Sequence, residues 1–234
     1  SLCRQGHHWS HFALANMLLQ EDDRGTASTT EAFGLYLKAA ELGVAPAYLN
    51  LANMYERGMG TEKDDAKALE WYSRAAKLGD PEAQMRLAYR LAHGEGVGKD
   101  DARAFKMFEE AAVSGKPTAV YNVGCAYFLG KGVPRDYAKA AEYFHRAAEE
   151  GFFPAQMNLG NMFQMGQGVP RSLDEALFWY SKAAQQNDDA LPALESLKER
   201  MRLSSGAADL SSGVDFAELG LGGDVAAGGA DGRF

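Results

Sequence analysis

Asparagine is the residue whose spacing most clearly suggests chemistry in this chain of 234 residues. Two series recur at intervals of about 36 residues. The first is Asn50, Arg86, Asn122 and Asn158, and the second is Asn16, Asn53, Tyr89, Cys125 and Asn161. An amide both donates and accepts hydrogen bonds, so a ladder of amides can pair with the backbone of an extended peptide. The alternative is that these amides only cap or bridge neighbouring helices, and the sequence leaves both open.

A third series runs beside the asparagines and consists of Glu56, Ala92, Phe128 and Gln164. Apolar residues follow a fourth series (Leu49, Met85, Tyr121 and Met157) that is either groove lining or packing between helices. From these series we predict one surface that binds a protein or peptide partner. Its predicted residues are Asn50, Asn53, Arg86, Tyr89, Asn122, Phe128, Asn158 and Asn161.

Other residues with possible chemistry have simpler explanations. The pairs Asp64-Asp65 and Asp100-Asp101 stand where helices are expected to start, so they are interpreted as caps and dipole-compensating charges. His7, His8 and His11 have a spacing that would hold a metal on a helix, but they lie at the end of the chain, where a helix is expected to fray, and no acid lies nearby. Cys3 and Cys125 are expected to be free thiols. We therefore predict no catalytic residues, no metal and no cofactor, and the protein is not expected to be an enzyme.

Composition excludes further classes of function. Against 24 Lys and Arg the chain has 32 Asp and Glu, a net charge of −8 and a pI near 5.2. Such a balance lacks the basic footprint that nucleic-acid backbones require. No stretch approaches the roughly 18 apolar residues of a membrane span, so direct membrane insertion is not expected. The first residue is Ser rather than Met, which suggests a trimmed N-terminus. The compartment stays open, with the cytosol or an organellar matrix favoured.

The elements that position these residues form a repeat. Residues 45–188 divide into four blocks of 36 residues, with small residues, large aliphatics and aromatics in the same register. Offsets of four place Ala47, Leu51 and Tyr55 on one face of a first helix, and Ala68 and Tyr72 on one face of a second. N-caps precede each second helix, and residues that tolerate a left-handed conformation follow it. The N-caps are Asp64, Asp100, Asp136 and Ser172, and the helix stops are Gly79, Gly115, Gly151 and Asn187.

The predicted fold class is all-α: a right-handed superhelical solenoid of about five helix-turn-helix repeats plus a capping helix. Residues 1–9 are an N-terminal extension, and the repeats are 10–44, 45–80, 81–116, 117–152 and 153–188. A capping helix is expected over 189–203, because Lys198 stands where the repeats have Ala or Gly. Residues 204–234 form a Gly/Ala-rich acidic tail that is either disordered or docked on a partner.

The repeat unit resembles the Sel-1-like repeat family, which is related to tetratricopeptide repeats. The resemblance rests on Leu-Gly or Leu-Ala in the first helix, and on the loops Gly94-Glu-Gly-Val97, Gly130-Lys-Gly-Val133 and Gly166-Gln-Gly-Val169. It implies a superhelix whose first helices line a concave wall, and an adaptor or scaffold that binds other proteins. An alternative is a structural accessory subunit of a larger complex, possibly organellar or membrane-associated. Cysteine-rich members of the family have a disulfide in each repeat, which this chain lacks.

Overall fold

The computed structural model describes residues 2–20 and 26–212, with side chains for 9–20 and 27–204. These residues form α-helices and one 3-10 turn, and no strand occurs among them. The α-helices are α1 (Leu2–Gln20), α2 (Thr26–Glu41), α3 (Pro46–Arg57), α4 (Asp65–Lys77), α5 (Pro81–His93), α6 (Asp101–Ala112), α7 (Pro117–Leu129), α8 (Tyr137–Glu149), α9 (Phe153–Met165), α10 (Leu173–Ala184) and α11 (Leu191–Ser212). The 3-10 turn is η1 (Asp188–Ala190).

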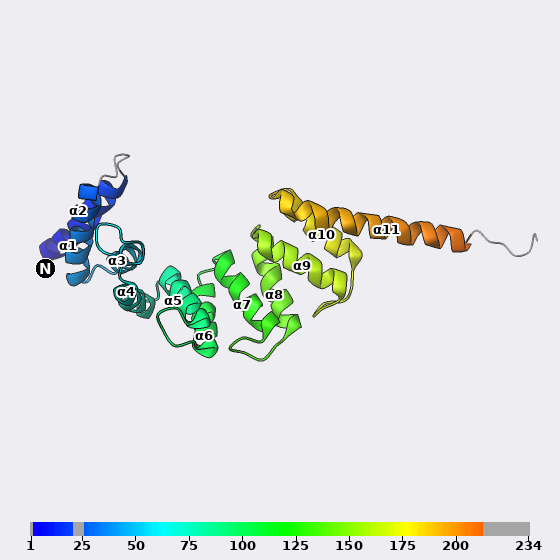
Figure 1. Ribbon diagram of the computed structural model, residues 1–234, viewed down its shortest axis with the longest axis horizontal. Helices are drawn as coiled ribbons and strands as arrows, with labels where there is room; N and C mark the ends of the chain where they lie inside the picture. The colour runs from blue at the N-terminus through cyan, green and yellow to red at the C-terminus, as the bar shows by residue number, and fades with distance from the viewer. Residues whose placement is uncertain (1, 21–25, 213–234) are drawn as a thin grey trace, which may run out of the picture.

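Successive helices pair into hairpins, and the hairpins stack along the long axis of the molecule in a curved row (Figure 1). The predicted all-α solenoid is therefore confirmed. We call α1, α3, α5, α7 and α9 the first helices, and α2, α4, α6, α8 and α10 the second helices. On the curve of Figure 1, α3 and α5 lie on the inner side and α4 and α6 on the outer side. No helix within the described residues is both long and apolar enough to cross a membrane.

The predicted helix starts are confirmed. Asp64, Asp100, Asp136 and Ser172 have extended backbones, and each side chain accepts a hydrogen bond from the backbone N–H three residues ahead. Three of the four predicted stops, Gly79, Gly115 and Gly151, have a positive φ. The fourth prediction was wrong, because Asn187 has a φ of −151° and accepts a hydrogen bond from the N–H of Asp189. Its side chain therefore starts η1 instead of ending α10 in a left-handed turn.

Small residues let the two helices of a hairpin approach closely. Ala52 and Ala88 are fully buried on first helices, and glycine takes their place at 124 and 160. A Cβ atom on Gly124 would lie 2.8 Å from the Phe144 ring, and one on Gly160 would lie 2.7 Å from the Tyr180 ring. These distances are shorter than carbon atoms tolerate, so each glycine accommodates an aromatic ring of the second helix.

In the second, fourth and fifth repeats, the second glycine of the inner loop lies against the backbone of the preceding repeat. A Cβ on Gly60, Gly132 or Gly168 would lie 2.0 to 2.2 Å from a backbone oxygen of the preceding repeat. The third repeat differs, because the nearest atom to a Cβ on Gly96 is Nη1 of Arg90, at 3.6 Å. Three of these four joints are thus closed by backbone contact, whereas the joint between the second and third repeats holds an arginine side chain.

Both ends of the repeat array extend further than expected. Helix α1 begins at Leu2, so most of the expected extension 1–9 belongs to the first helix of the first repeat. Helix α11 continues for nine residues past the expected end at Leu203, and the first part of segment 204–234 is helical. Ala207, Ala208 and Leu210 favour a helix, and the first Gly-Gly pair comes only at Gly222. The expectation for the remainder of the tail lies outside the described residues.

Candidate partner-binding site

The second asparagine series bonds to the second helix of its own repeat. The hydroxyl of Tyr72 in α4 donates to Oδ1 of Asn53, at 2.7 Å, and to Oε2 of Glu56, at 2.9 Å. In the last repeat, Tyr180 donates in the same way to Asn161, at 2.6 Å, and to Gln164, at 3.0 Å. In the first repeat Tyr36 donates to Asn16. We call the Tyr72 and Tyr180 arrangements the polar triads.

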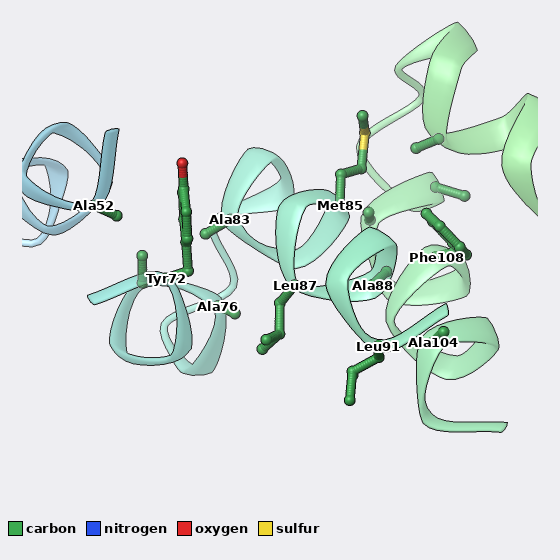
Figure 2. Close-up of a cluster of buried hydrophobic side chains, with 14 of the residues drawn as sticks. Ala52, Tyr72, Ala76, Ala83, Met85, Leu87, Ala88, Leu91, Ala104 and Phe108 are labelled. Atoms are coloured by element: carbon green, nitrogen blue, oxygen red, sulfur yellow. The ribbon is translucent and has the colours of Figure 1, made fainter. Parts of the chain in front are cut away.

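The third and fourth repeats lack these triads because phenylalanine replaces the tyrosine. Phe108 and Phe144 stand at the positions of Tyr72 and Tyr180, and the residues facing them are no longer an amide with a carboxylate or second amide. Tyr89 and Ala92 face Phe108, and Cys125 and Phe128 face Phe144. Figure 2 shows the Tyr72 ring between Ala52 and Ala83 with its oxygen at the outer tip, whereas the Phe108 ring, near Ala88, has only carbon atoms.

The first asparagine series connects consecutive first helices. Asn122 of α7 exchanges two hydrogen bonds with the Tyr89 hydroxyl of α5, at 2.8 and 3.0 Å. Asn158 of α9 donates to the Tyr121 hydroxyl of α7, at 3.1 Å. These two amides therefore bridge neighbouring helices, which is one of the two roles that the sequence left open.

The predicted site residues differ in exposure. Asn161 and Tyr89 are exposed, whereas Asn50, Asn53, Arg86, Phe128 and Asn158 are partly buried and Asn122 is buried. Burial raises the pKa of the Tyr180 hydroxyl, and burial together with the hydrogen bond to Glu56 raises that of Tyr72. The triad hydroxyls therefore stay protonated as donors. Asn161 accepts the Tyr180 hydrogen bond through Oδ1 although the residue as a whole is exposed.

A charged cluster adjoins the polar triad of the second repeat. Nη2 of Arg90 in α5 lies 2.7 Å from Glu56 of α3 and 3.5 Å from Asp65 of α4. Arg86 lies 3.8 Å from the same Glu56 carboxylate. Burial alone would raise the pKa of Glu56, but hydrogen bonds from Arg90 and Tyr72 and the charges of both arginines lower it overall. This cluster borders a polar pocket of about 370 Å³ at the joint between the second and third repeats.

A second pocket, mostly apolar and about 130 Å³ in volume, opens between α5, α6 and α7, where the triads are missing. Tyr89 and Asn122 from the predicted site line it, together with residues that the sequence analysis did not select. These are Ala92, His93, Asp101, Ala104, Phe105, Phe108, Cys125, Ala126, Leu129 and Lys131. The replacement of Tyr by Phe at 108 is the signal in the sequence that could have located this pocket.

Charge is distributed unevenly between the two sets of helices. α7 and α9 contain no Asp, Glu, Lys or Arg, although Leu129 and Met165 at their ends are 57% and 63% exposed. The second helices α4, α6, α8 and α10 hold two, three, two and two acidic residues, nine in all. The first helices α3, α5, α7 and α9 together hold only Glu56 and Glu82. Loss of charged residues combined with exposed Leu and Met is typical of the core of a protein interface.

The structure gives no metal site among its described side chains, where no group of three His, Cys, Asp or Glu residues is close enough to hold an ion. The His7 and His8 side chains of the candidate cluster lie outside that range. The described Cys125 is a free thiol, and burial raises its pKa, so it is a weak nucleophile at neutral pH.

Comparison with known families agrees with this geometry. The family model described as "Sel1 repeat" matches residues 10–44, 45–80, 81–115, 117–152 and 154–188. The chain belongs to the Sel1 repeat family. The suspected resemblance is therefore confirmed, and proteins of this family generally mediate protein–protein interactions and are typically non-catalytic.

Two solved structures are similar along most of this Sel1 repeat chain. One is c5321, a protective antigen of uropathogenic Escherichia coli strains, with 33% identity, 83% of this chain covered and a TM-score of 0.76. The other is a Sel1 repeat protein from Oxalobacter formigenes, with 31% identity, 75% of this chain and 78% of that chain covered, and a TM-score of 0.65. The match covers only 42% of the c5321 chain. No curated protein matches the sequence.

Proposed function

We propose that this Sel1 repeat protein is a non-catalytic adaptor that binds a protein or peptide partner on its first-helix face, the concave side of the solenoid. The observation that carries the proposal is the uncharged surface of α7 and α9, where exposed Leu129 lines the apolar pocket and Met165 is exposed at the end of α9. An uncharged wall can be covered by a partner without the cost of desolvating unpaired charges.

Polar groups beside this wall would fix the orientation of the partner. Asn161 and Tyr89 are exposed, and Arg86 and Asn158 are partly exposed at neighbouring positions. Amide and hydroxyl groups can pair with the backbone of an extended peptide, while the pocket accepts one apolar side chain. Binding energy is thus expected from the apolar contacts at α7 and α9, and register from the amides.

The experiment is affinity capture with the purified chain, followed by calorimetry with the identified partner. Leu129→Asp with Met165→Asp should weaken binding at least tenfold. The matched control is Leu78→Asp with Val113→Asp, two exposed residues that follow α4 and α6 directly and therefore share the same helix-end environment. Unchanged affinity in the first variant, with loss in the control variant, would place binding on the second-helix side and favour the accessory-subunit alternative.

A further inference from the structure

We propose that the pocket between α5, α6 and α7 receives the segment 213–221 from a second copy of this chain. The inference rests on the proposed function, because it assigns an occupant to the same first-helix face. It predicts that the protein self-associates head to tail, with the partner of the adaptor competing against the segment for one surface.

The segment combines apolar and acidic residues, which is the composition expected to fit this surface. Its sequence is Gly-Val-Asp-Phe-Ala-Glu-Leu-Gly-Leu, with apolar Val214, Phe216, Leu219 and Leu221 around two acidic residues. Residues 204–234 contain five acidic residues against Arg233 alone, which gives a charge of −4. The second helices α4, α6, α8 and α10 hold nine acidic and eight basic residues, so an acidic segment placed there would meet charges of both signs. The first helices α5, α7 and α9 hold only Glu82, at the start of α5, where Arg86 and Lys116 pair with it.

The pocket fits an aromatic anchor. A cavity of roughly 150 Å³ lined by apolar side chains accommodates a benzene ring, so about 130 Å³ suits the phenyl ring of Phe216. Phe105, Phe108 and Tyr89 line the pocket, and Tyr89 already meets Phe108 edge to face at 5.3 Å. A further ring would extend this aromatic cluster in favourable geometry.

The rim of the pocket provides a cation for the acidic residues that flank Phe216. Lys131 lines the pocket, and no ion pair joins it to a side chain among the described residues. The only carboxylate lining the pocket, Asp101, has Lys99 at 3.4 Å. Asp215 and Glu218 can therefore pair with Lys131.

The position of α11 requires a second copy. Phe216 is four residues past Ser212, a reach of about 14 Å even when fully extended. Figure 1 shows the end of α11 pointing away from the repeats, beyond α10 and far along the long axis from α5 and α7. The segment therefore cannot reach the pocket of its own molecule. Because the segment and the pocket are different surfaces, the contact is heterologous and continues from copy to copy.

The test uses a fluorescent peptide of residues 211–223 and, as receptor, the full chain with Phe216→Asp and Leu219→Asp, which cannot supply its own segment. Fluorescence anisotropy should show binding that weakens at least tenfold on adding Leu129→Asp, and not on adding Val113→Asp. A peptide with Phe216→Ala should also bind at least tenfold more weakly. Sedimentation of the unmodified chain should show association that grows with concentration and is absent in the receptor variant.

The proposal is overturned if the peptide does not bind, if its binding ignores Leu129→Asp, or if the unmodified chain stays monomeric at every concentration. Partner capture with the receptor variant shows whether only the proposed self-association fails or the proposed adaptor function fails as well. If the partner still depends on Leu129 while the peptide does not bind, the adaptor function stands and the self-association is wrong. If neither depends on Leu129, both are wrong.

Discussion

The second and fifth repeats stabilise the contact between their two helices with a hydroxyl, whereas the third and fourth repeats do so with ring packing alone. Tyr72 and Tyr180 donate to an amide and to Glu56 or Gln164. Phe108 and Phe144 occupy the same positions with no hydroxyl and with apolar or aromatic neighbours. The hairpin therefore needs the ring and not the hydroxyl, and in the third repeat the Phe108 ring without a hydroxyl lines the apolar pocket.

The largest loss of stability is expected at the small residue that packs against the aromatic ring. Repeats with tyrosine and repeats with phenylalanine both need this residue to be small. Gly160→Leu and Gly124→Leu should each lower the free energy of unfolding by about 3 kcal/mol, because the added side chain would overlap the Tyr180 or Phe144 ring. Urea denaturation measures this. Gly34→Ala in α2 is the control, since its Cβ would meet no atom within 4 Å. It should raise stability slightly. Equal stability of all three variants would contradict the packing.

The second largest loss of stability is expected from the removal of Glu56, which belongs to the polar triad of the second repeat. Glu56→Ala leaves the buried Arg90 with only Asp65, at 3.5 Å, so a loss of about 2 kcal/mol is expected. Arg90→Met should restore much of this loss in the double variant, because Met54 and Met162 occupy the equivalent position in other repeats. A double variant as unstable as Glu56→Ala would show that Arg90 is not the source of the cost.

The contribution of Glu56 should also depend on pH with a definite sign. The native state lowers the pKa of Glu56 below the ordinary value of 4.5. Its stabilising effect is therefore complete above that value and is lost as pH falls through the lower native pKa. The stability difference between the parent chain and Glu56→Gln should accordingly shrink on acidification below about pH 4.5. A difference that stays constant from pH 7 to pH 3 would contradict the electrostatic assignment.

Building a polar triad into the fourth repeat tests directly how the repeats with tyrosine differ from those with phenylalanine. Phe144→Tyr should cost about 1 to 3 kcal/mol, because the new hydroxyl is buried beside Cys125 and Phe128. Adding Cys125→Asn and Phe128→Gln should recover about 1 kcal/mol by rebuilding the fifth-repeat triad. The coupling free energy from the mutant cycle is the measurement. Additive effects would mean that the residues of a triad do not act together.

The smallest effect is expected from the loss of a single triad hydroxyl. Tyr180→Phe removes one donor while Asn161 and Gln164 keep access to water, so a loss of about 1 kcal/mol is expected. The thermal melting temperature should fall by a few degrees. No change at all would show that the hydroxyl is as dispensable here as in the third and fourth repeats.

The repeats were predictable from the sequence because their columns recur in one register, and each column marks a buried position such as Ala52 or Leu51. The role of the asparagines could not be predicted, because it depends on which residue of the second helix lies opposite each of them. Asn53 and Asn161 face tyrosines, and only a paired reading of both helices reveals this. The pocket was missed for the same reason, because Leu129 and Lys131 become neighbours of Phe108 only through stacking. The end of α11 was missed because the Gly/Ala-rich composition of residues 204–234 was interpreted as one tail, although its first residues continue the helix to Ser212.

The loop contact at Gly96 differs in its chemistry from those of the other joints. Three joints are closed by a loop glycine against a backbone oxygen, so no ionisable group takes part in those contacts. The joint between the second and third repeats is closed instead by Arg90 between Glu56 and Asp65. Arg90 is buried, so salt screens this ion pair less than it screens pairs on the surface. Acidification that protonates Glu56 should therefore alter this joint and leave the three backbone contacts unchanged.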